Sequence, residues 1–198
     1  MSGRAFVPRI DTAAHCPGDR TNDPVVYRRA RARSTEVLLR HLEKPMAGLY
    51  FEELYIGQQF QHPIRRTVTE SDNVWFSAIT HNPAQLHLDE EYCREHTEFG
   101  QRLVNSALTL GMMVGISVAE TTLGTAIANL GWDEVRFPQP LFHGDTIHVE
   151  TEIAELRESR SRPNAGIVVF LHRAYNQHNQ LVAHCRRSGL QAKRPVQG

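Results

Sequence analysis

The chain has 198 residues, which is enough for one domain with a sizeable core or for a smaller domain with a tail. Its 22 Lys and Arg residues balance its 22 Asp and Glu residues, so the net charge gives no case for a nucleic acid or an anionic membrane as partner. No window approaches the roughly 18 consecutive apolar residues of a membrane span, and the N-terminus lacks the apolar core of a secretory signal.

The N-terminal segment differs in charge from the rest of the chain. Residues 1–45 carry nine Lys and Arg residues against five Asp and Glu residues. We interpret residues 1–47 as a basic, flexible extension and residues 48–195 as the single folded domain. Two alternatives stay open: the extension is a docking or targeting arm, or the natural chain begins at Met46.

The first half of the domain predicts short helices separated by a proline. Thr69 precedes acidic residues and apolar residues at helical spacing, a pattern typical of a helix N-terminus. Pro83 ends this helix, because the residue before a proline favours extended conformations. A second helix is predicted after it, with Asp89 as its N-cap.

The longest apolar segment predicts a central helix over residues 104–121. Its sequence, LVNSALTLGMMVGISVAETTLG from residue 103 onward, is apolar almost all round. Such a helix is buried rather than surface-lying. We therefore expect a sheet wrapped around it.

The last third of the domain predicts that sheet. Alternating or β-branched patterns occur in four segments: ANLGWDEVRF, DTIHVETEIAEL, GIVVFLHRAYN and QLVAHCRRSGLQAK. Because the strands follow the helices rather than alternate with them, the pattern indicates an α+β fold.

One stretch, ITHNPAQLHLDEEYC, concentrates residues with chemical potential. It holds His81 and His87 with no Cys or carboxylate at metal-ligand spacing, and no pair of the eleven histidines suggests a metal site. An imidazole suits proton transfer near neutral pH. The alternative is a structural histidine near a helix end. The three cysteines lack CxxC spacing and indicate a reduced protein, for which we expect a cytoplasmic location.

Three segments together resemble the MaoC-like dehydratases, the (R)-specific enoyl-CoA hydratases with a hot-dog fold. FSAITHNPAQLHLDEEYC resembles the family's G-D-x-N-P-x-H-x-D signature, and LVNSALTLG stands where the family has its I-A-H-G-M-L entry to the central helix. VRFPQPLFHGDTI resembles V-R-F-x-x-P-V-x-x-G-D-T-L. The resemblance covers residues 48–192. It implies an antiparallel sheet around the central helix, with chains paired as a homodimer or higher homo-oligomer.

The activity that the resemblance implies is syn addition of water to a 2-enoyl-CoA, or the reverse dehydration, by a lyase that needs no cofactor. His87 matches the signature histidine. Asn82 stands five residues before it, where the family has its catalytic Asp, and Asn105-Ser106 replaces the Gly-Met of the helix entry. The sequence looks closest to a branch that acts on branched or dicarboxylic C5 thioesters, the mesaconyl- or itaconyl-CoA hydratases.

These residues suggest a division of roles. His87 takes a proton from water and returns it, while the Asn82 amide holds the water without carrying charge. Asn105 and Ser106, at the start of the central helix, bind the thioester oxygen through their amides, and plain N-capping is the alternative. The loss of the Asp suits an anionic acyl group, which a buried carboxylate would repel.

Two other functions stay open. Asn82 is compatible with a catalytically silent hot-dog module that only binds acyl-CoA. A hot-dog thioesterase is disfavoured, because that chemistry usually uses an Asp or Glu near the start of the central helix, and NSALTLGMMVG offers none.

Overall fold

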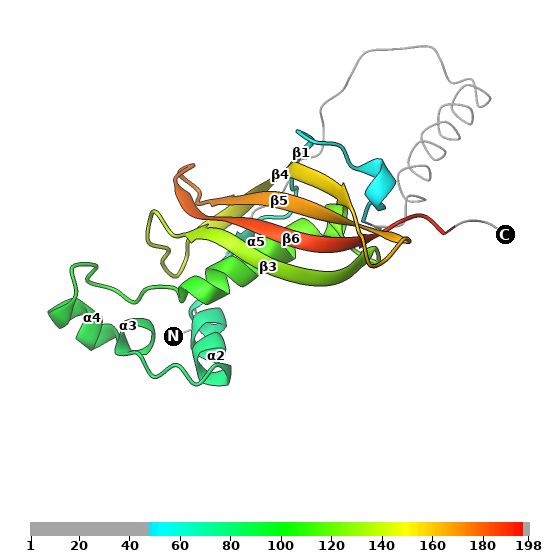
Figure 1. Ribbon diagram of the computed structural model, residues 1–198. Helices are drawn as coiled ribbons and strands as arrows, with labels where there is room; N and C mark the ends of the chain where they lie inside the picture. The colour runs from blue at the N-terminus through cyan, green and yellow to red at the C-terminus, as the bar shows by residue number, and fades with distance from the viewer. Residues whose placement is uncertain (1–47, 196–198) are drawn as a thin grey trace, which may run out of the picture. The chain divides into compact units, whose positions relative to one another are not determined.

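The computed structural model describes residues 48–195 (Figure 1). The predicted basic extension, residues 1–47, lies outside the described residues. In chain order the elements are η1 (Phe51–Glu53), β1 (Gln59–Gln61), β2 (Arg66–Thr67), α2 (Glu70–Ile79), α3 (Gln85–Leu88), α4 (Glu90–His96), α5 (Ser106–Thr121), β3 (Ala126–Arg136), β4 (Thr146–Glu158), β5 (Ala165–Tyr175) and β6 (Leu181–Ala192). Helices followed by strands confirm the predicted α+β class.

The sheet is antiparallel and runs in the order β1-β4-β5-β6-β3, while β2 pairs with the start of β4. Four of its strands are the ones predicted in the last third of the chain. Strand β3 pairs with β6 along one edge. Its other edge has no partner strand among residues 48–195, so β3 is an edge strand of this sheet.

Helix α5 packs against the concave face of the sheet (Figure 1), as the apolar segment predicts. Met113 and Ile116 of the helix form one buried cluster with Val149 of β4 and Cys185 of β6. The helix begins at Ser106 rather than at the predicted residue 104. The reason is local pairing: Val104 N–H donates to the Leu141 carbonyl at 2.9 Å, which holds this part of the chain extended.

Helices α2, α3 and α4 form an arm beyond the N-terminal end of α5 (Figure 1). The predicted caps are confirmed. Thr69 caps α2 in a capping box with Asp72, and the Thr69 hydrogen bonds are the main cause that lowers the pKa of the Asp72 carboxyl. Asp89 caps α4 by accepting from Tyr92 N–H at 2.9 Å. None of the helices in the described part of the chain is both long and apolar enough to cross a membrane.

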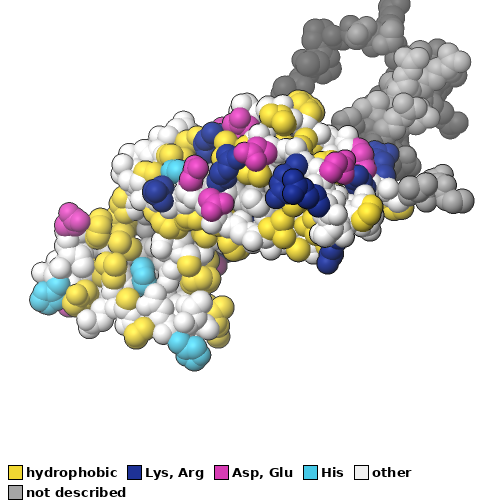
Figure 2. Space-filling view, in the orientation of Figure 1, with side chains coloured by type: hydrophobic (Ala, Val, Ile, Leu, Met, Phe, Trp, Pro, Cys, Tyr) yellow, Lys and Arg dark blue, Asp and Glu magenta, His cyan; other side chains and the backbone are white. Residues whose placement is uncertain are grey.

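The outer face of the sheet is charged. Figure 2 shows Lys, Arg, Asp and Glu side chains gathered over the strands, whereas the helical arm exposes hydrophobic and His side chains. The outer-face charges pair across strands, as in Arg173 with Glu152 at 3.3 Å and Arg186 with Glu155. Cross-strand ion pairs of this kind contribute little stability at the surface. The stability of the fold therefore comes mainly from the apolar packing between the sheet and α5.

The α5 face of the sheet also contains a buried polar chain that the sequence patterns did not indicate. His62 Nδ1 lies 2.5 Å from Glu120 Oε2, and His62 Nε2 lies 2.8 Å from Thr151 Oγ1. Thr151 Oγ1 is in turn 2.8 Å from His172 Nδ1. Burial lowers the pKa of His172 from 6.5 to about 3, with a smaller contribution from the Arg187 charge, so the ring is neutral in the folded protein.

This buried histidine predicts sensitivity to acid. The unfolded chain binds a proton at His172 near pH 6.5 while the folded chain resists it down to about pH 3, so stability falls as the pH drops through that window. The expected loss is about 1.4 kcal/mol per pH unit. Urea unfolding between pH 4 and 7 should therefore show a shallower pH slope for His172→Gln than for the wild type. His178→Gln, at an exposed position, should keep the wild-type slope; parallel slopes for all three proteins would contradict the assignment.

Candidate functional site

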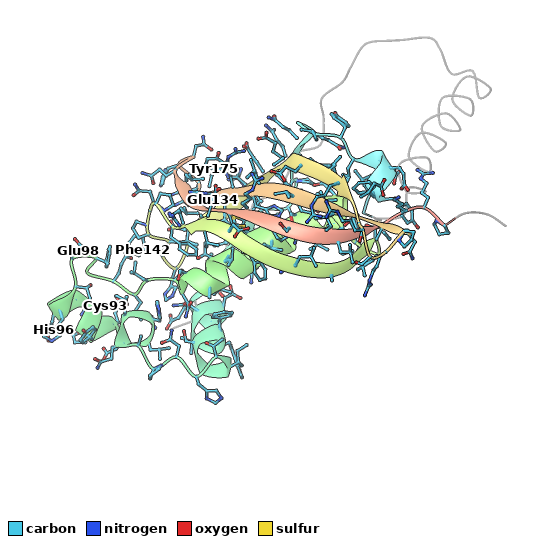
Figure 3. The ribbon with its side chains drawn as sticks, viewed as in Figure 1. Cys93, His96, Glu98, Glu134, Phe142 and Tyr175 are labelled. Atoms are coloured by element: carbon cyan, nitrogen blue, oxygen red, sulfur yellow. The ribbon has the colours of Figure 1, made fainter. Side chains whose placement is uncertain are left out.

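The fully buried side chain of Asn73 in α2 connects the segments around the candidate site. Its Nδ2 lies 2.9 Å from the Leu103 carbonyl, 3.2 Å from the His87 carbonyl and 3.0 Å from His143 Nε2. Its Oδ1 accepts from Asn105 N–H at 2.8 Å. One asparagine therefore joins α2, α3, the entry to α5 and the loop before β4. Figure 3 shows Phe142, the neighbour of His143, at this junction of the arm and the sheet.

The His87 ring, in the short helix α3, is held in one tautomer. Its Nδ1 lies 3.0 Å from the carbonyl oxygen of Leu103. A carbonyl oxygen only accepts, so Nδ1 carries the proton and the lone pair of the neutral ring is on Nε2. No residue in the described range hydrogen-bonds Nε2. The half-buried ring is therefore oriented with a basic nitrogen available.

His143 is a second histidine of this site. It accepts from Asn73 through Nε2, and burial lowers its pKa, with a smaller contribution from the charge of Arg102. The ring is therefore a neutral neighbour of His87. Sequence reasoning missed both Asn73 and His143. The available signal was an Asn inside a predicted helix, where it is unfavourable unless its side chain has a specific partner.

Arg102 links the acidic residues of the arm beside the site. It pairs with Glu70 of α2 at 2.8 Å and with Glu90 of α4 at 3.0 Å, and its side chain is only 13% exposed. The two ion pairs fasten α4 to the start of α2, so the segment that carries His87 is held at both ends.

Asn82 lies in the loop between α2 and α3. Its Oδ1 accepts from Ala84 N–H at 3.0 Å, which forms an Asx turn, and its backbone N–H donates to Ser77 at 2.9 Å. No described residue hydrogen-bonds its Nδ2, and no hydrogen bond joins it to His87. The neighbouring His81 is exposed with a φ of 54° and makes no hydrogen bond through its ring in this part of the chain.

The two residues at the start of α5 differ in how their backbone N–H groups are engaged. Asn105 is the N-cap, with Oδ1 accepting from Ala107 N–H at 3.0 Å, and its own N–H donates to Asn73. The Asn105 N–H therefore already has a protein acceptor, and substrate binding by Asn105 stays a prediction. The Ser106 N–H has no hydrogen-bond partner within residues 48–195. The helix N-terminus leaves it as the candidate donor to an oxyanion.

A cavity of about 260 Å³ begins beside Ser106. We call it the α5-start cavity; it is lined by Phe99, Leu103, Val104, Ser106, Thr109, Phe137, Pro138, Gln139, Pro140, Leu141 and Val182. Neither His87 nor Asn82 lines it, but Leu103, whose carbonyl holds the His87 ring, does. The arrangement combines an available imidazole nitrogen with a free backbone N–H at a helix N-terminus, a combination suited to acid–base chemistry on a carbonyl compound. No group of three His, Cys, Asp or Glu within residues 48–195 could hold a metal ion.

Comparisons with known proteins place the domain in a family. Residues 52–172 match the family model of the MaoC-like domain. The mesaconyl-CoA hydratase of Cereibacter sphaeroides is 29% identical over 139 residues, which is 70% of this chain and 40% of the relative. The crystal structure of a MaoC-like dehydratase from Rhodospirillum rubrum is 28% identical with a TM-score of 0.66, and the match covers 75% of this chain and all of that one.

A third similar structure belongs to a longer chain. A conserved hypothetical protein of Mycobacterium tuberculosis, described as having a double hot-dog fold, is 25% identical with a TM-score of 0.69. The match covers 76% of this chain but 46% of that chain. These likenesses confirm the predicted hot-dog fold. This chain spans less than half the length of that protein and of the Cereibacter relative.

Proposed function

Because the chain belongs to the MaoC-like domain family, we propose that it is a hydro-lyase that adds water to 2-enoyl-CoA thioesters, or removes it, without a cofactor. One observation carries the proposal: the Leu103 carbonyl fixes the His87 ring with Nε2 as the available base. The free N–H of Ser106, at the N-terminus of the 16-residue helix α5, supports it by providing a donor for the thioester oxygen.

The proposed reaction uses one imidazole twice. His87 Nε2 takes a proton from water as the oxygen bonds to the β-carbon, and the electrons of the double bond move onto the thioester oxygen beside the Ser106 N–H. The enolate then collapses, and the imidazolium returns the proton to the α-carbon on the same face. A histidine has a pKa close to neutral pH, which allows both transfers. Dehydration is the same sequence reversed.

Asn82 replaces a carboxylate in this scheme. Its free Nδ2–H can hold the attacking water by donating to it, while its Oδ1 keeps the Asx turn with Ala84. We propose a dicarboxylic or branched C5 acyl group as substrate. The Cereibacter relative is named a mesaconyl-CoA hydratase, and the mesaconyl group belongs to this class. A second carboxylate on the acyl chain tolerates a neutral amide better than a buried negative charge.

Replacing Asn82 with aspartate tests this point. The Asx turn accepts either residue, so the fold should be unchanged. The added charge should lower kcat/KM for mesaconyl-CoA by at least about tenfold relative to crotonyl-CoA, because like charges repel strongly at low effective dielectric. Steady-state kinetics with the two thioesters measure the ratio, and an unchanged preference would count against the proposed role.

A single assay separates the proposed function from its two alternatives. The purified chain is incubated with 2-enoyl-CoA thioesters while the absorbance of the conjugated enone and the release of free thiol are followed together. Loss of enone without thiol indicates a hydratase. Thiol release would indicate the thioesterase, and no change with any thioester would favour the silent binding module.

We also propose that the working unit is a homodimer joined through β3. The edge strand exposes the large apolar side chains of Ile127 (39%), Leu130 (51%) and Trp132 (46%). The exposed stripe of Ala107, Gly111 and Gly115 on α5 provides room for a second helix. A pair of these chains would also provide two hot-dog units, as the double hot-dog neighbour has in one chain.

Charging the β3 edge should break the pair. Leu130→Lys introduces an ammonium where two chains would meet, and burying an unpaired charge is costly. Light scattering after gel filtration should give a dimer mass for the wild type and a monomer mass for the variant. Tyr55→Lys, which adds the same charge at a 64% exposed side chain preceding β1, is the matched control and should stay dimeric. A monomeric wild type, or a dimeric Leu130→Lys protein, would contradict the proposal.

A further inference from the structure

Arg187 of β6 is a buried cation that the proposed reaction does not use. It lies on the face of the sheet that α5 covers, opposite Phe170 of β5 and Trp132 of β3. Only 7% of the residue is exposed, and its guanidinium carbon lies 4.8 Å from the centre of the Phe170 ring. Its Nε has no hydrogen-bond partner and no carboxylate pairs with it in the described part of the chain. Burial lowers its pKa, because desolvation disfavours the charged form of the guanidinium.

Arg187 lines a cavity of about 290 Å³ between the end of α5 and the strands β3 and β6. We call it the Arg187 cavity; its lining is Val118, Thr122, Leu123, Gly124, Ala126, Ala128, Asn129, Arg187, Gly189, Leu190 and Gln191. Arg187 is the one cationic side chain in this lining, which contains no Asp or Glu. The neighbouring His172 has a buried Nε2 that is also without a partner. The cavity therefore combines a desolvated positive charge with space for a small anion.

The Arg187 cavity and the α5-start cavity are at opposite ends of α5, which has 16 residues and is thus about 24 Å long. One small acyl group cannot reach both within a chain. Strand β3, however, begins at Ala126 in the Arg187 cavity and ends at Arg136, and residues 137–141 line the α5-start cavity. A twofold antiparallel pairing of two β3 edges places the start of one strand beside the end of the other. The Arg187 cavity of one protomer then adjoins the α5-start cavity of its partner.

We propose that the Arg187 cavity is a carboxylate-binding subsite, and that its ligand is the free carboxylate of a dicarboxylyl thioester held by the partner's His87 segment. The guanidinium fork matches a carboxylate through two parallel N–H donors, and a single cation balances a single negative charge. A phosphate monoester concentrates up to two negative charges on one group, which is more than this lining balances, whereas each carboxylate of a dicarboxylate carries one. The carboxylate subsite stands on the buried guanidinium, whereas its link to a thioester rests on the proposed hydratase function and on the β3 pairing.

Titration calorimetry on the full chain tests the subsite without any turnover, with mesaconate and inorganic phosphate as probes. Arg187→Met removes the charge at similar volume, and Arg187→Lys keeps the charge but loses the fork. The wild type should bind mesaconate in preference to phosphate. Arg187→Met should weaken mesaconate binding by about 10- to 100-fold, the effect of losing a charge-assisted hydrogen-bonded pair, and Arg187→Lys should fall between them.

Arg186→Met is the matched control, because it removes the same charge from the next residue of β6 on the outer face of the sheet. It should bind mesaconate as the wild type does. Equal mesaconate binding by Arg187→Met and the wild type would overturn the proposal. So would tighter binding of phosphate than of mesaconate, or no binding of mesaconate by the wild type.

Kinetics then test the link to the thioester. Arg187→Met should lower kcat/KM for mesaconyl-CoA by about 10- to 100-fold while crotonyl-CoA, which lacks the second carboxylate, changes little. If the wild type turns over both thioesters and Arg187→Met leaves the ratio of the two kcat/KM values unchanged, the thioester assignment is overturned. If the wild type turns over neither, the proposed hydratase function fails together with this assignment, and the mesaconate titration still decides the carboxylate subsite.

Discussion

Replacing His87 with alanine is expected to lower kcat for hydration by about 100- to 10,000-fold, the usual contribution of a positioned general acid–base group. The imidazole is the proposed base and the proposed acid, so its loss removes both proton transfers at once. The side chain is half-buried on a four-residue helix and makes one hydrogen bond through its ring, to the Leu103 carbonyl. The melting temperature should therefore change much less than the rate.

The control for this substitution is His81→Ala. His81 belongs to the same signature stretch but is exposed, and no described residue hydrogen-bonds its ring. Its removal should leave kcat within about twofold of the wild type, as expected for a surface change away from the chemistry. Full activity of a folded His87→Ala protein would exclude the histidine from the reaction.

Replacing Asn73 with alanine is expected to destabilise the domain by about 2–5 kcal/mol and to reduce hydration at the same time. The substitution leaves the carbonyls of His87 and Leu103 and the N–H of Asn105 without their buried partner. Each unsatisfied buried group costs about 1–3 kcal/mol. The Leu103 carbonyl also holds the His87 ring, so the proposed base loses part of its support.

Urea unfolding gives the free energy, and kinetics below the unfolding transition give the rate of the folded fraction. The matched control is Asn164→Ala in the exposed loop between β4 and β5, which should change the unfolding free energy by less than about 0.5 kcal/mol. An Asn73→Ala protein as stable as this control would show that the buried hydrogen bonds do not hold the site together.

The parts of the fold that the sequence predicted correctly depend on local patterns. The caps at Thr69 and Asp89 rest on residues within one helical turn, and the central helix and four strands rest on hydrophobic periodicity. The start of α5 was misplaced because Val104 is held by Leu141, 37 residues later in the chain. A pairing at that separation leaves no local pattern.

The candidate site was predicted only in part for the same reason. His87 belongs to a short signature, whereas Asn73 acts through partners 14 to 70 residues away in the sequence. The Asn105 amide could not be recognised as engaged, because its acceptor is that same distant side chain. Arg187 did leave a signal. Successive side chains of a strand point to opposite faces, so one of the adjacent arginines 186 and 187 had to face the central helix.

The most direct test of the proposed hydratase is the mass of the thioester recovered after incubation with mesaconyl-CoA in water labelled with heavy oxygen. The proposal predicts an intact thioester that has gained one labelled water molecule with the wild type, and unchanged substrate with His87→Ala. Labelled free acid with released CoA, or an equal gain of water with His87→Ala, would contradict it.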